Sequence, residues 1–422
     1  MKKTEIRSIA FFYPSKNFGG AENLIIRLTQ QLLARNYKIT IIDYKNGVVI
    51  SKLRNLEGIR FLEYFDNKPL FLSRITHLVS FSLRIENIRR QFIVRDRIVL
   101  LIWFIHPYHI FRLIEPIPWN VAQYLYMNYK RKIRQMLTDM DKKSSVVFMC
   151  NENYYISKEY FGLKFMPKYL QIPVNGSNYE MVKKYEDRGQ LSFVWLGRLA
   201  VEKVNILIYV LHEVKKHIEQ KNIFIDFYIV GSGSAGIVLN RYLDDYSSDH
   251  INIKRIEMIP PEDLREFLKD KKLLFAMGTS ALEGGILGLP TILLDYSYYD
   301  YRKIIKKGYK FKWLYQTRDY KIGSNIFKNF KAIESENKLE MDDIFDTIID
   351  PVKSKEIAQN CQKYSYIHHR MGVVIQKMSE ILKNASFTIQ ELVVYDLSKN
   401  IFERVSDSVY IFGKKIKKNI TR

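Results

Sequence analysis

The chain has 422 residues, of which 47% are hydrophobic and 14% aromatic, so it belongs among folded globular proteins rather than disordered ones. Its two cysteines, Cys150 and Cys361, lie far apart and outside any CxxC or Cys/His spacing, which argues against a disulfide framework and a zinc site and fits a reducing cytosol. The 67 basic residues exceed the 45 acidic ones by 22, and such an excess calls for an anionic partner.

Length and hydropathy limit the architecture further. A chain of this size predicts two domains of about 150–200 residues each. The longest apolar run, residues 98–105, is about a third of what a membrane-spanning helix needs, and the first residues lack a signal peptide's cleavage pattern. We therefore expect a protein that is neither exported nor membrane-spanning. Residues 1–150 carry 25 basic and 11 acidic side chains, so the first domain is the expected anionic contact surface.

The chain opens with a predicted strand, helix and strand. Residues 7–14 form a short apolar run, residues 23–36 place leucines on one helical face, and residues 38–43 form the next apolar run. Asn36 stands where a left-handed helix end is expected. Gly19 and Gly20 precede the helix, where a bare backbone and free N–H groups favour an anion, although a turn without a ligand fits this stretch equally well.

The remaining chain alternates between strands and helices. Further strands are predicted at 97–105 and 145–150, and a second series of elements begins at residue 191. The pattern predicts α/β architecture, with two Rossmann-like, doubly wound domains facing a central cleft. The predicted boundaries are 1–175 for the first domain, 176–190 for a linker, 191–352 for the second domain, 353–385 for a helical segment that packs back on the first domain, and 386–422 for an amphipathic basic tail.

Three strands of the second series end in polar or glycine-rich loops. These loops are GRLAVEK from Gly197, GSGSAG from Gly231 and MGTSALEGG from Met277. Because the carboxyl ends of parallel strands share one edge of a sheet, the loops should lie together. Arg198 offers a planar fork for a phosphate and Lys203 a point charge, so the two residues could neutralise a diphosphate without a metal.

The ordered set of these loops with the GGAE at 19–22 resembles the GT-B glycosyltransferases of the glycosyl transferase group 1 type over roughly residues 7–295. The resemblance implies a nucleotide-sugar donor held mainly by the second domain, an acceptor held by the first, and neither a metal nor another cofactor. It implies catalytic roles for Arg198, Lys203 and His106. The donor-binding residues implied by the resemblance and the loops are Gly19, Gly20, Gly197, Gly231, Gly233, Gly278, Thr279, Ser280 and Glu283.

Two positions of the family pattern stay open. The family has two glutamates eight positions apart; Glu283 matches the second, which binds the ribose, whereas the first falls on Phe275. The donor sugar is then held differently, for instance by backbone at 278–280, and retention or inversion at the anomeric carbon stays undecided. His106 and His109 are both candidates for the family's first-domain histidine, and each also fits a packed side chain.

Some residues suggest sites that the sequence does not support. Asp139 and Asp141 spell the DxD of metal-bound nucleotide sugars, but they end a basic helical segment instead of following a buried strand. We therefore expect no metal. His368 and His369 lie in a polar helix and are expected to face solvent.

The basic surfaces suggest an anionic membrane as partner. Residues 124–140 and the C-terminal residues combine apolar and basic side chains in the manner of interfacial helices, although a helix packed on its own domain fits too. We expect a cytoplasmic protein held at the inner face of the cell membrane, which transfers sugar to a lipid-linked or saccharide acceptor in bacterial surface polysaccharide synthesis. The alternatives are a sugar-nucleotide epimerase, a catalytically weak partner subunit and, least supported, a nucleic-acid-binding protein. The base, the sugar, the acceptor and the oligomeric state stay open.

Overall fold

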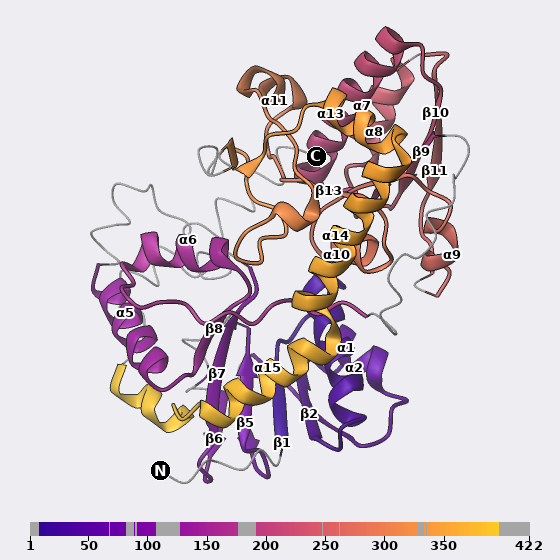
Figure 1. Cartoon of the computed structure of the whole chain (residues 1–422). Coiled ribbons are helices and arrows are strands. Elements are labelled where there is room, and N and C mark those ends of the chain that lie inside the picture. Colours follow the sequence, from indigo (N-terminus) through magenta and orange to yellow (C-terminus); the bar gives the residue numbers. More distant parts are fainter. Residues whose placement is uncertain are drawn as a thin grey trace, which may run out of the picture. The chain divides into compact units, whose positions relative to one another are not determined.

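The computed structural model describes residues 8–66, 68–81, 88, 91–106, 127–175, 191–246, 248–260, 262–327, 333–334 and 336–395. The chain divides into two compact units (Figure 1). Unit 1 comprises Met1–Gln171 together with Val374–Arg422, and unit 2 comprises Ile172–Val373. Unit 1 thus takes residues from both ends of the sequence.

Unit 1 is built on a parallel six-stranded sheet with the order β3-β2-β1-β5-β7-β8. The strands are β1 (Ser8–Phe12), β2 (Lys38–Asp43), β3 (Ile59–Glu63), β5 (His77–Ser80), β7 (Val99–Phe104) and β8 (Val146–Phe148). Every residue of β1, β5 and β7 is buried, as expected for parallel strands covered on both faces. The strand order reverses at β1, so the topological switch point lies between β1 and β5.

The helices of unit 1 pack apolar faces on this sheet. Helix α1 buries Leu24, Ile25, Leu28 and Leu32, and Asn36 after it has the left-handed φ of 63° that its position predicts. The helices are α1 (Gly20–Leu33), α2 (Val48–Leu53), α5 (Met127–Lys142), α6 (Asn151–Phe161), α15 (Met371–Asn384) and the short 3₁₀ helix η3 (Ile389–Tyr395). Strands β4 (Leu70–Leu72) and β6 (Phe92–Val94) form a separate two-stranded sheet.

Helix α15 and the residues after it anchor at the amino-terminal ends of the unit 1 strands. The carbonyl of Leu382 lies 3.1 Å from Nε2 of His77, the first residue of β5. The backbone of Phe387 then accepts from Leu100, and that of Ile389 donates to Ile98. Burial lowers the pKa of His77 to about 4, partly opposed by the hydrogen bond to Leu382. This segment therefore leaves the opposite, carboxyl edge of the sheet to the connecting loops.

Unit 2 is built on a parallel five-stranded sheet with the order β11-β10-β9-β12-β13. The strands are β9 (Leu191–Leu196), β10 (Ile225–Val230), β11 (Ile251–Ile256), β12 (Leu273–Ala276) and β13 (Thr291–Leu293). The helices are α7 (Val201–Lys221), α8 (Gly236–Asp244), α9 (Leu264–Leu268), α10 (Thr279–Ile286), α11 (Tyr301–Lys307), η2 (Leu314–Gln316), α13 (Met341–Ile349) and α14 (Pro351–His369). Both sheets thus have the doubly wound α/β pattern that the sequence predicts.

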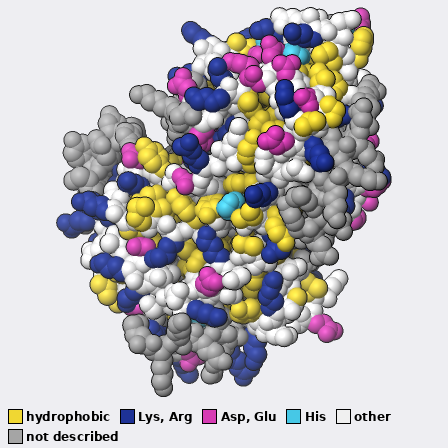
Figure 2. All heavy atoms as spheres, viewed as in Figure 1, with side chains coloured by type: hydrophobic (Ala, Val, Ile, Leu, Met, Phe, Trp, Pro, Cys, Tyr) yellow, Lys and Arg dark blue, Asp and Glu magenta, His cyan; other side chains and the backbone are white. Residues whose placement is uncertain are grey.

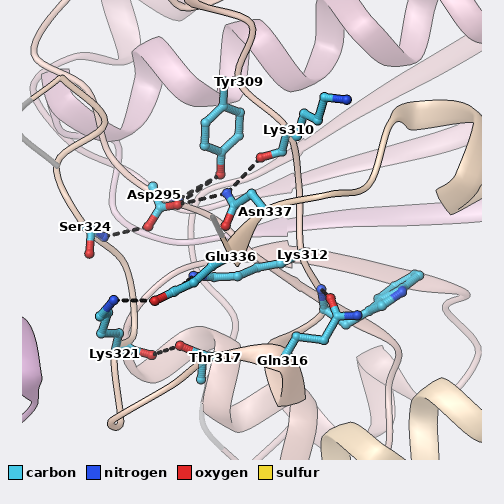
Figure 3. A network of polar contacts seen from close by, with 11 residues as sticks. Asp295, Tyr309, Lys310, Lys312, Gln316, Thr317, Lys321, Ser324, Glu336 and Asn337 are labelled. Atoms are coloured by element: carbon cyan, nitrogen blue, oxygen red, sulfur yellow. Dashed lines mark hydrogen bonds and ion pairs between the residues drawn. The ribbon is translucent and has the colours of Figure 1, made fainter. Parts of the chain in front are cut away.

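A buried polar network fixes the segments that follow β13 (Figure 3). Asp295 is 1% exposed and accepts hydrogen bonds from the backbone of Ser324 at 2.7 Å and from the Asn337 amide at 3.2 Å. Nearby, Glu336 pairs with Lys312 at 2.8 Å and also with Lys321. Burial raises the pKa of Glu336, but the two lysines outweigh it and hold the pKa below its usual value.

The C-terminal third differs from the predicted division. Helix α14 packs against α10 within unit 2, so that of the segment 353–385 only the part from Val374 belongs to unit 1. The first residues of the predicted tail bury Phe387, Ile389 and Leu392 in the core of unit 1, whereas 396–422 lie outside the described residues.

The structure decides between the two alternatives for the apolar side of α5 and corrects the expectation that His369 faces solvent. The apolar side chains of α5, among them Ile133, Met136 and Leu137, are buried in the core of unit 1 and are not available to a bilayer. His369 is 1% exposed, because its Nδ1 lies 2.8 Å from the Ile172 carbonyl. Within the described chain, none of the helices is both long and apolar enough to cross a membrane.

Glu336→Gln should lower the free energy of unfolding at pH 7 by about 3 kcal/mol, because it leaves buried Lys312 without a counter-charge. Since the pKa of Glu336 is lowered on folding, the loss should shrink as the pH falls below about 4.5 and the wild-type carboxylate is protonated. Urea denaturation at pH 7 and pH 4 measures both effects. Glu266→Gln is the matched control, because the Lys269–Glu266 pair is solvent-exposed and its loss should change stability by less than about 0.5 kcal/mol; equal losses in the two variants would contradict the assignment.

Candidate functional site

The candidate site of unit 2 lies at the carboxyl edge of its sheet. Strand β9 lies between β10 and β12, and the strand order reverses there, so the topological switch point is between β9 and β12. Each of these two strands leads within a few residues into a helix, α7 after β9 and α10 after β12. Two helix N-termini with free N–H groups therefore begin at this edge, which is the arrangement that favours an anionic ligand.

The loop after β9 is held by the loop after β10. The backbone N–H of Leu199 donates to Ser232 at 2.9 Å, and that of Ala235 donates back to Leu199 at 3.0 Å. A Cβ on Gly231 would lie 2.0 Å from the Gly197 oxygen, and one on Gly233 would lie 2.5 Å from the Leu199 oxygen. Gly231 and Gly233, expected to bind the donor, thus have a direct structural role in letting the two loops approach each other.

Arg198 and Lys203 both extend from this fixed loop and the first turn of α7. The Arg198 side chain is 65% exposed, and its guanidinium lies 4.0 Å from Glu202. The Lys203 amine, in contrast, has no hydrogen-bond or ion-pair partner among the described residues. Burial lowers the pKa of Lys203, the Arg198 charge lowers it further, and Glu202 opposes both. The structure therefore places two cations and one carboxylate, Glu202, together at this edge, and their role in binding a phosphate stays a prediction.

Glu202 is the member of this group that the sequence reading missed. It lies four residues after Arg198 and directly before Lys203, in the first turn of α7. The spacing of four residues is the one that brings side chains together on a helix, so it could have identified the pair from the sequence.

The second half of the site is the start of α10. Gly278 has a φ of 66°, donates its N–H to the Ile322 carbonyl at 2.7 Å, and has open space where a Cβ would lie. Thr279 and Ser280 form the first turn of α10, and Glu283, half-buried, lies one turn further along the same helix. These predicted donor-binding residues therefore lie together on one short element.

Phe275 stands at the position of the family pattern's first glutamate, and this position lies in the core of unit 2. It lies within β12, fully buried, with its ring 6.0 Å from Phe193 and 6.2 Å from Phe227. Only Met277 and Gly278 separate β12 from α10. A connection of two residues is too short to carry the first glutamate of the family pattern towards a sugar. The position eight residues before Glu283 therefore lies in the core.

In unit 1, the predicted glycine loop carries its own carboxylate. Gly19 caps α1 with an extended backbone, and a Cβ on Gly19 would lie 3.1 Å from Oε2 of Glu22, a residue that is 5% exposed. The loop is fixed from behind by Asp43, which accepts from the backbone of Ser15 at 2.8 Å. Burial raises the pKa of Asp43, partly opposed by its backbone hydrogen bonds. Negative charge at this helix start suits a hydroxyl-bearing ligand better than a phosphate.

The histidine and aspartate candidates have different environments. His106 lies two residues after the end of β7 and is exposed, and it has interactions of its own, whereas His109 lies outside the described residues. Asp139 contacts Lys142 and Tyr395, and Asp141 pairs with Lys168 at 3.1 Å. Both aspartates of the DxD are thus used in contacts within unit 1. Among the residues the structure describes, no group of three or more potential ligands is arranged for a metal ion.

Lys203→Met should leave the ligand-free protein as stable as the wild type at pH 7, or more stable, because it removes a partly buried charge next to Arg198. Since folding lowers the pKa of Lys203, the unfolded chain binds more protons, and the penalty should fade as the pH rises towards 10. Urea denaturation at pH 7 and pH 9.5 checks this. The control is Lys215→Met on the same helix, whose amine lies 3.9 Å from Glu219; a loss above about 1 kcal/mol for Lys203→Met alone would contradict the model.

Comparison with known proteins supports the fold. No family model and no curated protein sequence matches the chain. Among solved structures it is similar to sucrose-phosphate synthase from Thermosynechococcus elongatus, with a TM-score of 0.53 and 10% identity over 89% of this chain and 98% of that one. It is also similar to an alpha-glucosyltransferase in complex with UDP and DNA, with a TM-score of 0.51 and 10% identity over 90% and 100% of the two chains. Together with the two doubly wound parallel sheets, these similarities show that the chain has the GT-B fold.

Proposed function

We propose that the protein is a glycosyltransferase that takes a sugar from a nucleotide-sugar donor bound to unit 2. The proposal rests on one observation: Arg198 lies next to Lys203 at the switch point of the unit 2 sheet, and the Lys203 amine has no hydrogen bond or ion pair among the described residues. Two neighbouring cations next to two helix N-termini, with the pKa of Lys203 lowered by burial and by the Arg198 charge, suit a doubly charged diphosphate.

The chemistry follows from where charge develops during transfer. As the bond between the sugar and the diphosphate breaks, negative charge grows on the leaving phosphate, and fixed cations and N–H groups stabilise that charge without reorganisation. In the proposal, Arg198 and Lys203 hold the leaving diphosphate and the backbone at 278–280 holds the donor sugar. Glu283 then binds the ribose hydroxyls, and no metal takes part.

The fold and its neighbours support this assignment. The alpha-glucosyltransferase with a similar fold was solved with UDP, and the second neighbour is a sucrose-phosphate synthase. Unit 1 would bind the acceptor, for which the exposed His106 provides a polar group at the carboxyl edge of its sheet, while Gly19 and Gly20 stay proposed contacts of the donor. Fold alone does not define the acceptor, so we infer its class, a lipid-linked or other saccharide of bacterial surface polysaccharide, from the basic surface.

Basic side chains are spread over the displayed face of the molecule rather than gathered in one patch (Figure 2). In α5, Arg131 and Arg134 are exposed while the apolar side of the helix is buried. We therefore propose that any attachment to the inner face of the cell membrane is electrostatic, with attraction of about 1 kcal/mol for each basic residue near the surface.

Arg198→Ala and Lys203→Ala should each lower kcat/KM for the donor about 100-fold to 1000-fold, because each removes a charge from the leaving phosphate. Arg198→Lys should recover part of the loss, since an ammonium cannot reproduce the guanidinium fork. Glu283→Gln should weaken nucleotide binding more than it lowers kcat. Release of nucleoside diphosphate from a panel of nucleotide sugars, with and without EDTA, is the measurement, and Lys215→Ala is the control on the same helix.

Three outcomes would contradict the proposal. Near-native turnover by folded Arg198→Ala and Lys203→Ala would remove the assigned phosphate site. Loss of all activity in EDTA, restored by manganese, would show that the reaction needs a metal. Conversion of the donor sugar without any acceptor or release of nucleoside diphosphate would instead identify an epimerase.

Reversing Arg131 and Arg134 to glutamate should reduce co-sedimentation with anionic liposomes at low salt and leave nucleotide affinity unchanged. Because the apolar face of α5 is buried, the wild-type binding should disappear as the salt approaches molar concentrations. Lys353→Glu with Lys363→Glu, two exposed lysines of α14 in unit 2, is the charge-matched control. Equal binding to neutral and anionic vesicles would show that the attachment is not electrostatic.

A further inference from the structure

One buried polar group of unit 2 has no role in the fold and lies beside the candidate phosphate site. Trp195 is the fifth residue of β9 and is 1% exposed. Its ring nitrogen Nε1 is buried and has no hydrogen-bond partner. A buried donor without an acceptor costs about 1–3 kcal/mol, so its persistence in the core needs an explanation.

The position of the indole nitrogen relative to Gly197 supplies that explanation. A Cβ built on Gly197 would lie 3.9 Å from Nε1 of Trp195 and 4.0 Å from Nζ of Lys203. Apart from Gly197 and its two chain neighbours, no other heavy atom of the described residues lies within 4 Å of that point. The missing side chain of Gly197 therefore leaves a small hollow, and the two groups nearest to it are both donors without acceptors.

The groups around this hollow determine which ligand it can bind. Both flanking groups donate hydrogen bonds, one of them carries a charge, and neither has an acceptor from the protein. Gly197 itself is partly exposed, whereas Nε1 of Trp195 is shielded, so an entering oxygen has to displace the side chain of Lys203 or the loop slightly to reach the indole N–H. A negatively charged oxygen placed where the Cβ would lie is about one ångström too far from each donor for a hydrogen bond. A shift of that size towards the two donors brings it within hydrogen-bonding distance of both.

We propose that Gly197, Trp195 and Lys203 form a pocket for one non-bridging oxygen of the ligand's diphosphate. Trp195 is thus a binding residue of the donor site, through its indole N–H, although it belongs to a core strand. Gly197 is required because any side chain would occupy the place of the oxygen. The proposal rests on the phosphate site of the proposed function and adds two residues to it.

The chain offers a matched control for the tryptophan. Trp103 in β7 of unit 1 is also fully buried, but its Nε1 donates to the Leu170 carbonyl at 3.0 Å. The same substitution, tryptophan to phenylalanine, thus removes an unsatisfied donor at Trp195 and a satisfied one at Trp103. Gly197→Ala is the second test, because contacts at 3.9 and 4.0 Å are ordinary and the protein should fold with the methyl group in the hollow.

The experiment measures the dissociation constants of UDP, GDP, ADP and inorganic pyrophosphate by calorimetry for the wild type and the four variants Trp195→Phe, Gly197→Ala, Trp103→Phe and Arg198→Ala, with thermal unfolding without ligand as the folding check. We expect Trp195→Phe and Gly197→Ala each to weaken diphosphate binding about tenfold or more, the range of a hydrogen bond to a charged group. Trp103→Phe should bind as the wild type does, while its unfolding temperature falls. Trp195→Phe should lose less thermal stability than Trp103→Phe, because no satisfied hydrogen bond is removed.

The outcomes separate this pocket from the proposed function. Wild-type affinity in either Trp195→Phe or Gly197→Ala, alongside weak binding by Arg198→Ala, would overturn the pocket and leave the function standing. Binding of pyrophosphate but of no nucleotide, lost in both variants, would support the pocket and contradict the function. Failure of the wild type to bind any of the four compounds would overturn both.

Discussion

The candidate site depends on a contact between two backbone segments at the carboxyl edge of the unit 2 sheet. The loops after β9 and β10 lie so close that the Gly197 oxygen occupies the place of a Cβ on Gly231, and the Leu199 oxygen that of a Cβ on Gly233. Their φ angles, 142° and 156°, are also strained for any other residue. This contact determines where Arg198 lies and where α7 begins. The cations of the site are therefore positioned by glycines that carry no functional group.

The same site holds several groups that are unfavourable in the free protein. The Lys203 amine is partly buried beside another cation, and the Trp195 indole N–H has no acceptor. Both costs would be recovered only when an anion is bound, which is the usual compromise between stability and function. The buried network of Asp295 and Glu336, which fixes the segments after β13, provides stability in the same unit away from the candidate site.

Much of the fold follows from local sequence patterns. The residues of β2 and the left-handed Asn36 were predicted directly, because a short apolar run and a helix end depend on neighbours in the chain. The placement of Arg198, Lys203 and Glu283 at the carboxyl edge of the unit 2 sheet could be predicted because their motifs are short and ordered along the chain. The environment of Phe275 could not, since the length of the β12–α10 connection is visible only once the strand's end is known. Trp195 escaped notice because a tryptophan in an apolar run gives no sign of whether its N–H finds an acceptor. The buried faces of α5 and His369 depend on partners distant in sequence.

The chain passes from unit 1 to unit 2 after Gln171 and returns at Val374, so that unit 2 is an insertion within unit 1. Phe387, Ile389 and Leu392 complete the unit 1 core, and Ile389 pairs with the start of β7, almost 300 residues earlier. During synthesis, unit 2 therefore has all of its residues before unit 1 does. Part of the core of the six-stranded sheet in unit 1 therefore stays uncovered while unit 2 is synthesised. Apolar surface of the N-terminal segment is therefore exposed on the nascent chain until the last residues of unit 1 have been synthesised, and such surface promotes aggregation.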